Sequence, residues 1–145
     1  MRTTLAAIAV GAVLLIPASP AAANARIASG GDGPVAHKSG AIINYTSVAK
    51  LKVARHMFIH FTCTVTCDAT GRAVIKGRGI KIPITASASG IPGGTPAFME
   101  LTVKGILLKL LKANPGRFKV LNTINATDPT TGATDTITHT FKFRR

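Results

Sequence analysis

The longest alternation of apolar and polar side chains in this sequence runs from residue 51 to residue 67. Odd positions in this segment are mostly apolar, whereas even positions are mostly lysine, histidine and threonine. A period of two residues places successive side chains on opposite faces of a strand, and it predicts that one face is buried. Because the segment is longer than an ordinary strand, we expect it to break near Cys63 and Cys67.

Shorter alternating runs follow along the rest of the chain, separated by turn residues. These predicted strands lie at 72–76, 80–88, 99–103, 118–126 and 137–143. Pro83 has no amide hydrogen to donate, so we expect its strand to lie at the edge of a sheet. The last two runs flank a turn at 128–132 and are expected to form a hairpin.

Residues 106–112, with the sequence ILLKLLK, change to a helical pattern that stops at Asn114, Pro115 and Gly116. A helix of about two turns is marginal alone, so we expect it to cap one open end of the sheets rather than to lie on a membrane surface. The pattern as a whole predicts an all-β fold, an antiparallel β-sandwich of about six or seven strands with one short helical crossover.

The beginning of the chain has the features of a cleavable signal peptide. Arg2 supplies a positive charge, residues 5–16 are uncharged and mostly apolar, and small residues before Arg26 predict cleavage there. The apolar stretch is shorter than the roughly 20 residues of a transmembrane helix. We therefore expect a secreted, extracellular protein. Its predicted parts are a signal peptide at 1–25, a flexible leader at 26–40 and a folded domain at 41–145.

The two cysteines, Cys63 and Cys67, are four residues apart. In an exported protein an even pair favours a disulfide. In a straight strand their Cα atoms would be about 13 Å apart, whereas a disulfide requires about 4.4–6.8 Å. A bridge therefore requires residues 64–66 to turn or bulge, and the alternatives are two reduced thiols or a metal site.

The formal net charge is +13, from 18 lysines and arginines against five acids. Such a surface attracts polyanions such as nucleic acid, anionic polysaccharide or anionic lipid headgroups, although charge also serves solubility alone. The cations around the predicted helix are the candidate anion-binding residues: Lys104, Lys109, Lys112, Arg117 and Lys119.

Neither the acids nor the histidines form a catalytic pattern. General acid–base catalysis requires carboxylates poised in one pocket, and the spacing of the acids does not predict such a pair. His56 and His60 would lie about 13 Å apart on a strand, too far to bind one metal together. We therefore predict a protein that is not an enzyme and has no cofactor or metal.

The order of motifs from about Lys50 to Arg145 resembles that of bacterial Ig-like (fibronectin-III-like) modules of secreted surface proteins. These motifs are Cys-x3-Cys, a Gly-Gly-Thr loop, the strand LTVKG, a short helix with lysines, FKVLNTINATD and DTITHTFKF. The resemblance implies a spacer, adhesion or binding role and no enzymatic activity. Thr64–Thr66 between the cysteines is more strand-like than is usual in such modules, and the absence of tryptophan excludes an antibody-type core.

These observations lead to a secreted binding or structural module that contacts cell-wall polysaccharide or nucleic acid through its basic surface. The alternatives are a cationic membrane-active effector and, ranked last, a metal-dependent hydrolase that uses the histidines.

Overall fold

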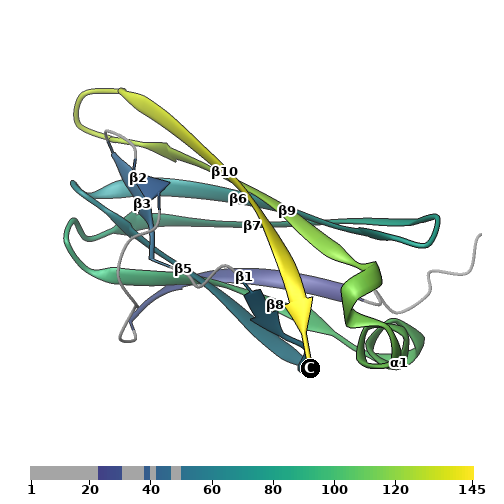
Figure 1. Cartoon of the computed structure of the whole chain (residues 1–145). Helices are drawn as coiled ribbons and strands as arrows, with labels where there is room; N and C mark the ends of the chain where they lie inside the picture. Colours follow the sequence, from purple (N-terminus) through teal and green to yellow (C-terminus); the bar gives the residue numbers. More distant parts are fainter. Residues whose placement is uncertain (1–22, 31–37, 40–41, 47–49) are drawn as a thin grey trace, which may run out of the picture.

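The computed structural model describes residues 23–30, 38–39, 42–46 and 50–145, which form two five-stranded sheets. The first sheet contains, in spatial order, β1 (Ala23–Ser29), β8 (Pro96–Val103), β5 (His56–Cys63), β3 (Ile43–Tyr45) and β2 (Lys38–Ser39). The second contains β4 (Lys50–Lys52), β10 (Thr134–Arg144), β9 (Lys119–Thr127), β6 (Cys67–Gly77) and β7 (Ile80–Ile91). The predicted all-β sandwich is confirmed (Figure 1). One neighbouring pair, β4 with β10, is parallel rather than antiparallel.

The inward-facing side chains of the two sheets form one hydrophobic core. Phe61 and Leu101 of the first sheet and Ile75 and Val120 of the second are fully buried. The predicted alternation accounts for this core, because every second side chain along β5 and β9 is buried. Burial of apolar surface contributes roughly 25 cal/mol per Å² and is the main source of stability.

A buried polar link joins the two sheets through the core. The Tyr45 hydroxyl of β3 donates a hydrogen bond to Asn122 Oδ1 of β9 at 2.6 Å, and the Asn122 side-chain amide lies 3.2 Å from Met99 Sδ of β8. Burial raises the pKa of Tyr45, so its hydroxyl remains a donor at neutral pH. The buried Tyr45 hydroxyl and the buried Asn122 side chain therefore each have a hydrogen-bond partner within the core.

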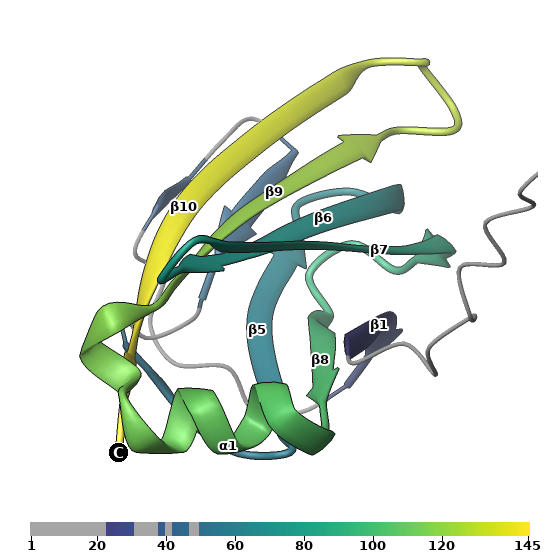
Figure 2. The same ribbon diagram turned by 90° about the vertical axis from the view of Figure 1, so that its right-hand side faces the viewer.

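The helix α1 (Gly105–Ala113) follows β8 and lies across one end of the sandwich (Figure 2). Leu107 and Leu111 are buried against the core, whereas Ile106 is 77% exposed. The prediction of a short helix packed over an open end is therefore confirmed. A short 3-10 helix, η1 (Pro115–Arg117), leads from α1 into β9.

Cys63 and Cys67 form a disulfide, with their Cα atoms 6.2 Å apart. Residues 64–66 bend between β5 and β6, as the bridge requires. The backbone of Gly93 packs so closely on this bend that a Cβ atom there would lie 2.7 Å from Val65 Cα. The predicted bridge and the predicted break in the long alternating segment are both confirmed.

The prediction of a flexible leader at 26–40 is contradicted at residues 38–39, which form β2, and also at residues 26–29. Residues 26–29 belong to β1, which pairs with β8 from Ala23 opposite Val103 to Ser29 opposite Ala97. Ile27 is the one large apolar side chain of this strand and is 8% exposed. The predicted cleavage point therefore lies inside β1. The signal peptide remains a prediction, because residues 1–22 lie outside the described residues, as do 31–37 and 40 of the leader.

The prediction of about six or seven strands agrees with the number of long strands and leaves out the short ones. Seven strands have seven or more residues, and β2, β3 and β4 have two or three. The strand that contains Pro83 is β7, at the edge of the second sheet as predicted. β9 and β10 form the predicted hairpin.

Candidate anion-binding site

A row of lysines crosses all five strands of the second sheet. We call it the lysine row, and its members in spatial order are Lys50, Lys142, Lys119, Lys76 and Lys81. Each lysine is the register partner of the next, so the row runs across the strands for four strand spacings, roughly 19 Å. Their chain neighbours Ile75, Val120 and Phe141 are buried, which places the lysine side chains on the outer face.

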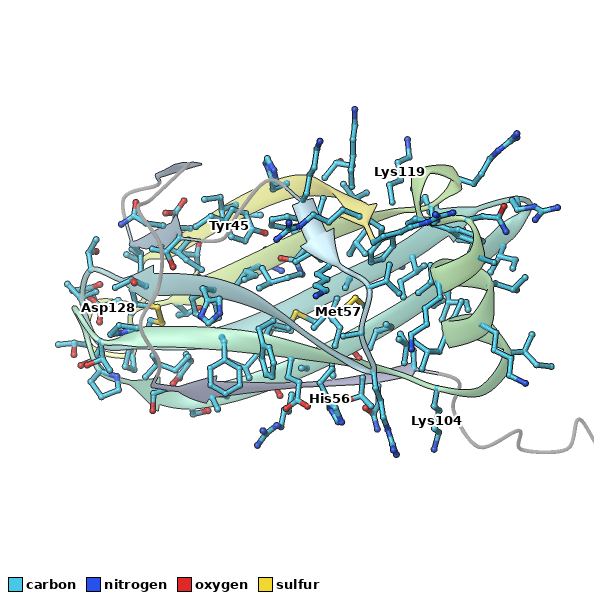
Figure 3. The ribbon with its side chains drawn as sticks, turned by 60° about the horizontal axis from the view of Figure 1, so that its bottom comes forward. Tyr45, His56, Met57, Lys104, Lys119 and Asp128 are labelled. Carbon is cyan, nitrogen blue, oxygen red and sulfur yellow. A yellow bond between two sulfur atoms is a disulfide. The ribbon has the colours of Figure 1, made fainter. Side chains whose placement is uncertain are left out.

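In the part of the chain that the structure describes, no acidic side chain forms an ion pair with the lysine row. Both ion pairs found there involve Glu100 of the first sheet, and none reaches the row. Asp68 and Asp135 are the second residues of β6 and β10, and Asp128 follows β9, so these acids lie at the end of the sheet away from the row. Figure 3 shows Asp128 far from Lys119. Because like charges directly opposite each other are destabilising, the row has a cost in stability. Its positive potential favours an anion.

A cavity of about 420 Å³ opens at the side of the row nearest η1. Four lysines of the row and Arg117 supply the cations of its lining. Phe118 and Phe143 add an apolar part, and both rings are almost fully buried. This volume is within the range of about 300–1,000 Å³ that is usual for small-ligand sites. The cavity therefore combines strong positive charge with some apolar surface.

One wall of this cavity depends on a close backbone approach. A Cβ atom added to Gly77, at the end of β6, would lie 2.2 Å from the carbonyl oxygen of Arg117 and 2.7 Å from the Phe118 ring. Only glycine allows η1 to approach β6 this closely. The approach holds Arg117 next to the lysine row.

A second, shallower hollow of about 220 Å³ lies on the other side of the row. Lys76 and Lys81 of the row contribute to it, together with Arg72 and Thr123. Val74 and Leu121 are register partners and provide the apolar part of its lining. The row is thus flanked on both sides by hollows that are charged and partly apolar.

The structure does not bring together the five candidate residues predicted from the sequence. Arg117 and Lys119 line the larger cavity. Lys109 and Lys112 lie on α1, and Lys104 precedes its first residue. Figure 3 shows Lys104 and Lys119 on opposite sides of the sandwich.

Sequence reasoning missed four members of the lysine row: Lys50, Lys76, Lys81 and Lys142. The alternating pattern places each of them on a polar face, which was a usable signal. Their alignment depends on the register between strands, and the alternation within one strand does not contain that information.

The outer face of the first sheet carries a separate polar cluster. The Arg26 side chain donates a hydrogen bond to Glu100, and His56 Nδ1 lies 2.6 Å from Glu100 Oε1. The hydrogen bond from Arg26, supported by His56, lowers the pKa of Glu100 although burial opposes this shift. Glu100 is therefore ionised and paired at neutral pH.

His56 and His60 are on strand β5, as expected, and not on a helix. In the described ranges, no group of three or more histidine, cysteine or acidic side chains could hold a metal ion. No helix in the same ranges is long and apolar enough to cross a membrane. No protein-family model matches the sequence, and the comparison with curated proteins gives no match.

Proposed function

We propose that this protein is a secreted, non-enzymatic Ig-like module that binds anionic polymers along the lysine row. The observation that carries the proposal is the alignment of five lysines across five strands, with none of the acids that the structure describes paired to them. An extended ligand with repeated negative charges could contact all five at once. Neutralising the row would also relieve the repulsion between its members.

The alternative of a membrane-active effector has less support. It requires an exposed apolar face on α1, but Leu107 and Leu111 of that helix are buried in the core. Ile106 alone is a small apolar anchor. Vesicles of anionic lipid that retain an entrapped dye in the presence of the protein would argue against this alternative.

The proposal is tested by retention of the purified protein on polysaccharide, cell-wall polymer and DNA columns at increasing salt. Each charge contact to DNA contributes about −0.9 to the slope of log affinity against log salt. The variant K76Q/K119Q/K142Q removes the three central charges of the row, so we expect its slope to be shallower by about 2–3 units.

The control variant K104Q/K109Q/K112Q removes the same number of charges around α1. We expect it to keep nearly the wild-type slope, because its residues lie outside the row. Equal losses in the two triple variants would mean that only net charge matters, which would contradict a role for the row. Absence of retention at low salt would reject the proposal and leave the charge with a role in solubility.

A further inference from the structure

We infer that the larger cavity, between η1 and the lysine row, is a site for one compact oxyanion that carries two or more negative charges, such as a phosphate group. This site goes beyond the proposed function, because the cavity holds one small anion, whereas the row contacts a polymer along its length. Three observations support it: the number of cations around one volume, the half-burial of Lys76 and the fixed position of Arg117.

Five cations surround a single volume of about 420 Å³. Lys50, Lys142, Lys119 and Lys76 line it from four strands, and Arg117 lines it from η1. Both ion pairs among the described residues involve Glu100, so neither of them neutralises a cation of the cavity. A group with a single negative charge would leave most of this positive charge uncompensated. A group that concentrates several charges in one place therefore gains the most.

The cavity also differs from the rest of the row in the burial of its cations. Lys76 is half-buried, whereas the other four lysines of the row are exposed. Phe118 and Phe143 supply the apolar part of the lining. Charges interact more strongly next to low-dielectric walls than on an open surface. A small anion inside the cavity approaches the half-buried Lys76 as well as the exposed cations at the rim.

Arg117 contributes geometry as well as charge. The close approach of η1 to β6 at Gly77, where a Cβ atom would lie 2.2 Å from the Arg117 carbonyl oxygen, holds this residue at the cavity. A guanidinium group donates parallel hydrogen bonds to two oxygens of one oxyanion, whereas an ammonium group acts as a point charge. One guanidinium and four ammonium groups together offer more charge than a single carboxylate can neutralise.

The same lining disfavours recognition of a nucleobase. Base stacking requires exposed aromatic faces, but Phe118 and Phe143 are only 3% and 5% exposed. The anionic group is therefore the recognised part of the ligand. It can belong to a small free compound or to the end of a phosphorylated polymer, and the experiment separates these two sources.

The experiment is calorimetric titration of the purified protein at neutral pH and about 0.15 M salt, where exposed charge pairs are screened. The probes are pyrophosphate, sulfate, adipate and a long polyphosphate chain. Sulfate and adipate are both dianions, but a methylene chain separates the two charges of adipate. We expect one pyrophosphate per protein molecule. Sulfate should bind more weakly than pyrophosphate but about tenfold more tightly than adipate, because its oxygens share the charge-assisted hydrogen bonds of one site.

Two residues provide a matched pair of variants, because Arg117 lines the cavity without belonging to the row and Lys81 belongs to the row without lining the cavity. Arg117→Gln should weaken pyrophosphate binding about tenfold or more, since it removes charge-assisted hydrogen bonds. Lys81→Gln removes the same charge, but screening should keep its effect below about threefold. Arg117→Lys keeps the charge and loses the parallel donors, so its loss should be intermediate. Thermal unfolding without ligand verifies that each variant is folded.

The polyphosphate chain identifies the source of the anion. A number of bound protein molecules that does not change with chain length would support the site and assign it to chain ends. Binding of pyrophosphate without such end binding would support the site and assign it to a small free compound.

Three results would overturn the inference and leave polymer binding along the row standing. They are absence of pyrophosphate binding, equal affinities for sulfate and adipate, and equal losses in Arg117→Gln and Lys81→Gln. The reverse pattern is also distinguishable. Tight pyrophosphate binding by a protein that no polymer column retains would support the cavity site and reject the proposed function.

Discussion

Replacing the central lysine of the row should stabilise the protein. Lys119 has Lys76 directly opposite on one side and Lys142 on the other, so Lys119→Gln removes two opposed like-charge pairs. Glutamine retains a similar length and polarity on the outer face. The expected result is a higher free energy of unfolding, which is unusual for a substitution at a candidate binding residue.

The size of the effect follows from the geometry of the row. Opposed Cβ atoms lie about 4.5–5.5 Å apart, and flexible lysines spread their ammonium groups to roughly 7 Å. At that separation in water, each pair repels by about 0.6 kcal/mol before screening. With a Debye length of about 8 Å at 0.15 M salt, the two pairs together retain about 0.5 kcal/mol. At 0.01 M salt they retain about 1 kcal/mol, and at 1 M almost nothing.

The assay is urea unfolding of the wild type and of Lys119→Gln at these three salt concentrations, with the free energy of unfolding obtained by linear extrapolation. Lys109→Gln is the control, because it removes one charge from α1 outside the row. We expect its effect to be clearly smaller at low salt. A Lys119→Gln variant that is no more stable than the wild type at 0.01 M, or whose gain persists at 1 M, would refute the view that the row is repulsive.

Three further changes should alter stability in defined directions. Replacing both Cys63 and Cys67 with alanine removes the disulfide that closes a loop of five residues. The loss of this constraint on the unfolded chain should lower the free energy of unfolding by about 2 kcal/mol. Urea unfolding under oxidising conditions measures this change. Arg78→Asn should raise the free energy of unfolding by about 0.5–1 kcal/mol. Arg78 has a φ of 49° in the two-residue turn between β6 and β7, and asparagine tolerates that conformation better than arginine. An unchanged midpoint of urea unfolding would contradict this reasoning. Glu100→Gln should cost about 1 kcal/mol at pH 7, since the arginine and histidine partners of Glu100 are well exposed. Because the pKa of Glu100 is lowered in the folded state, the difference in stability between the wild type and Glu100→Gln should be fully present above about pH 4.5. It should shrink as the pH falls through the pKa of Glu100 in the folded protein. A stability difference that grows in acid would contradict the ion pairs of Glu100.

The strands and the helix could be predicted because their patterns are local. The alternation at 118–126 and the helical pattern at 106–112 correspond closely to β9 and α1. β1 was missed because alanine, asparagine and serine surround its one large apolar residue, Ile27, and give almost no alternation in hydrophobicity. Its place in the sheet comes from pairing with β8, which is distant in sequence.

The binding site illustrates the same limit. The alignment of Lys76 with Lys81 follows from the short hairpin between β6 and β7, so it was accessible in principle. The alignment of Lys76 with Lys119, and of Lys142 with Lys50, requires strand pairs that no short turn fixes. The sequence therefore predicts a cluster of cations that are close in sequence around the helix, whereas the folded protein aligns cations from different strands.

The separation of charge along the second sheet has a consequence for how the molecule approaches a ligand. From Asp68 to Lys76, β6 alone spans roughly 26 Å between an acidic end and a basic end. The domain therefore carries a permanent electric dipole along its long axis in addition to its net charge. Near a negatively charged surface this dipole turns the molecule before contact, so that the basic end arrives first and the loop at Asp128 faces away. A population of these molecules on such a surface would share one orientation and present the same acidic end to the solvent.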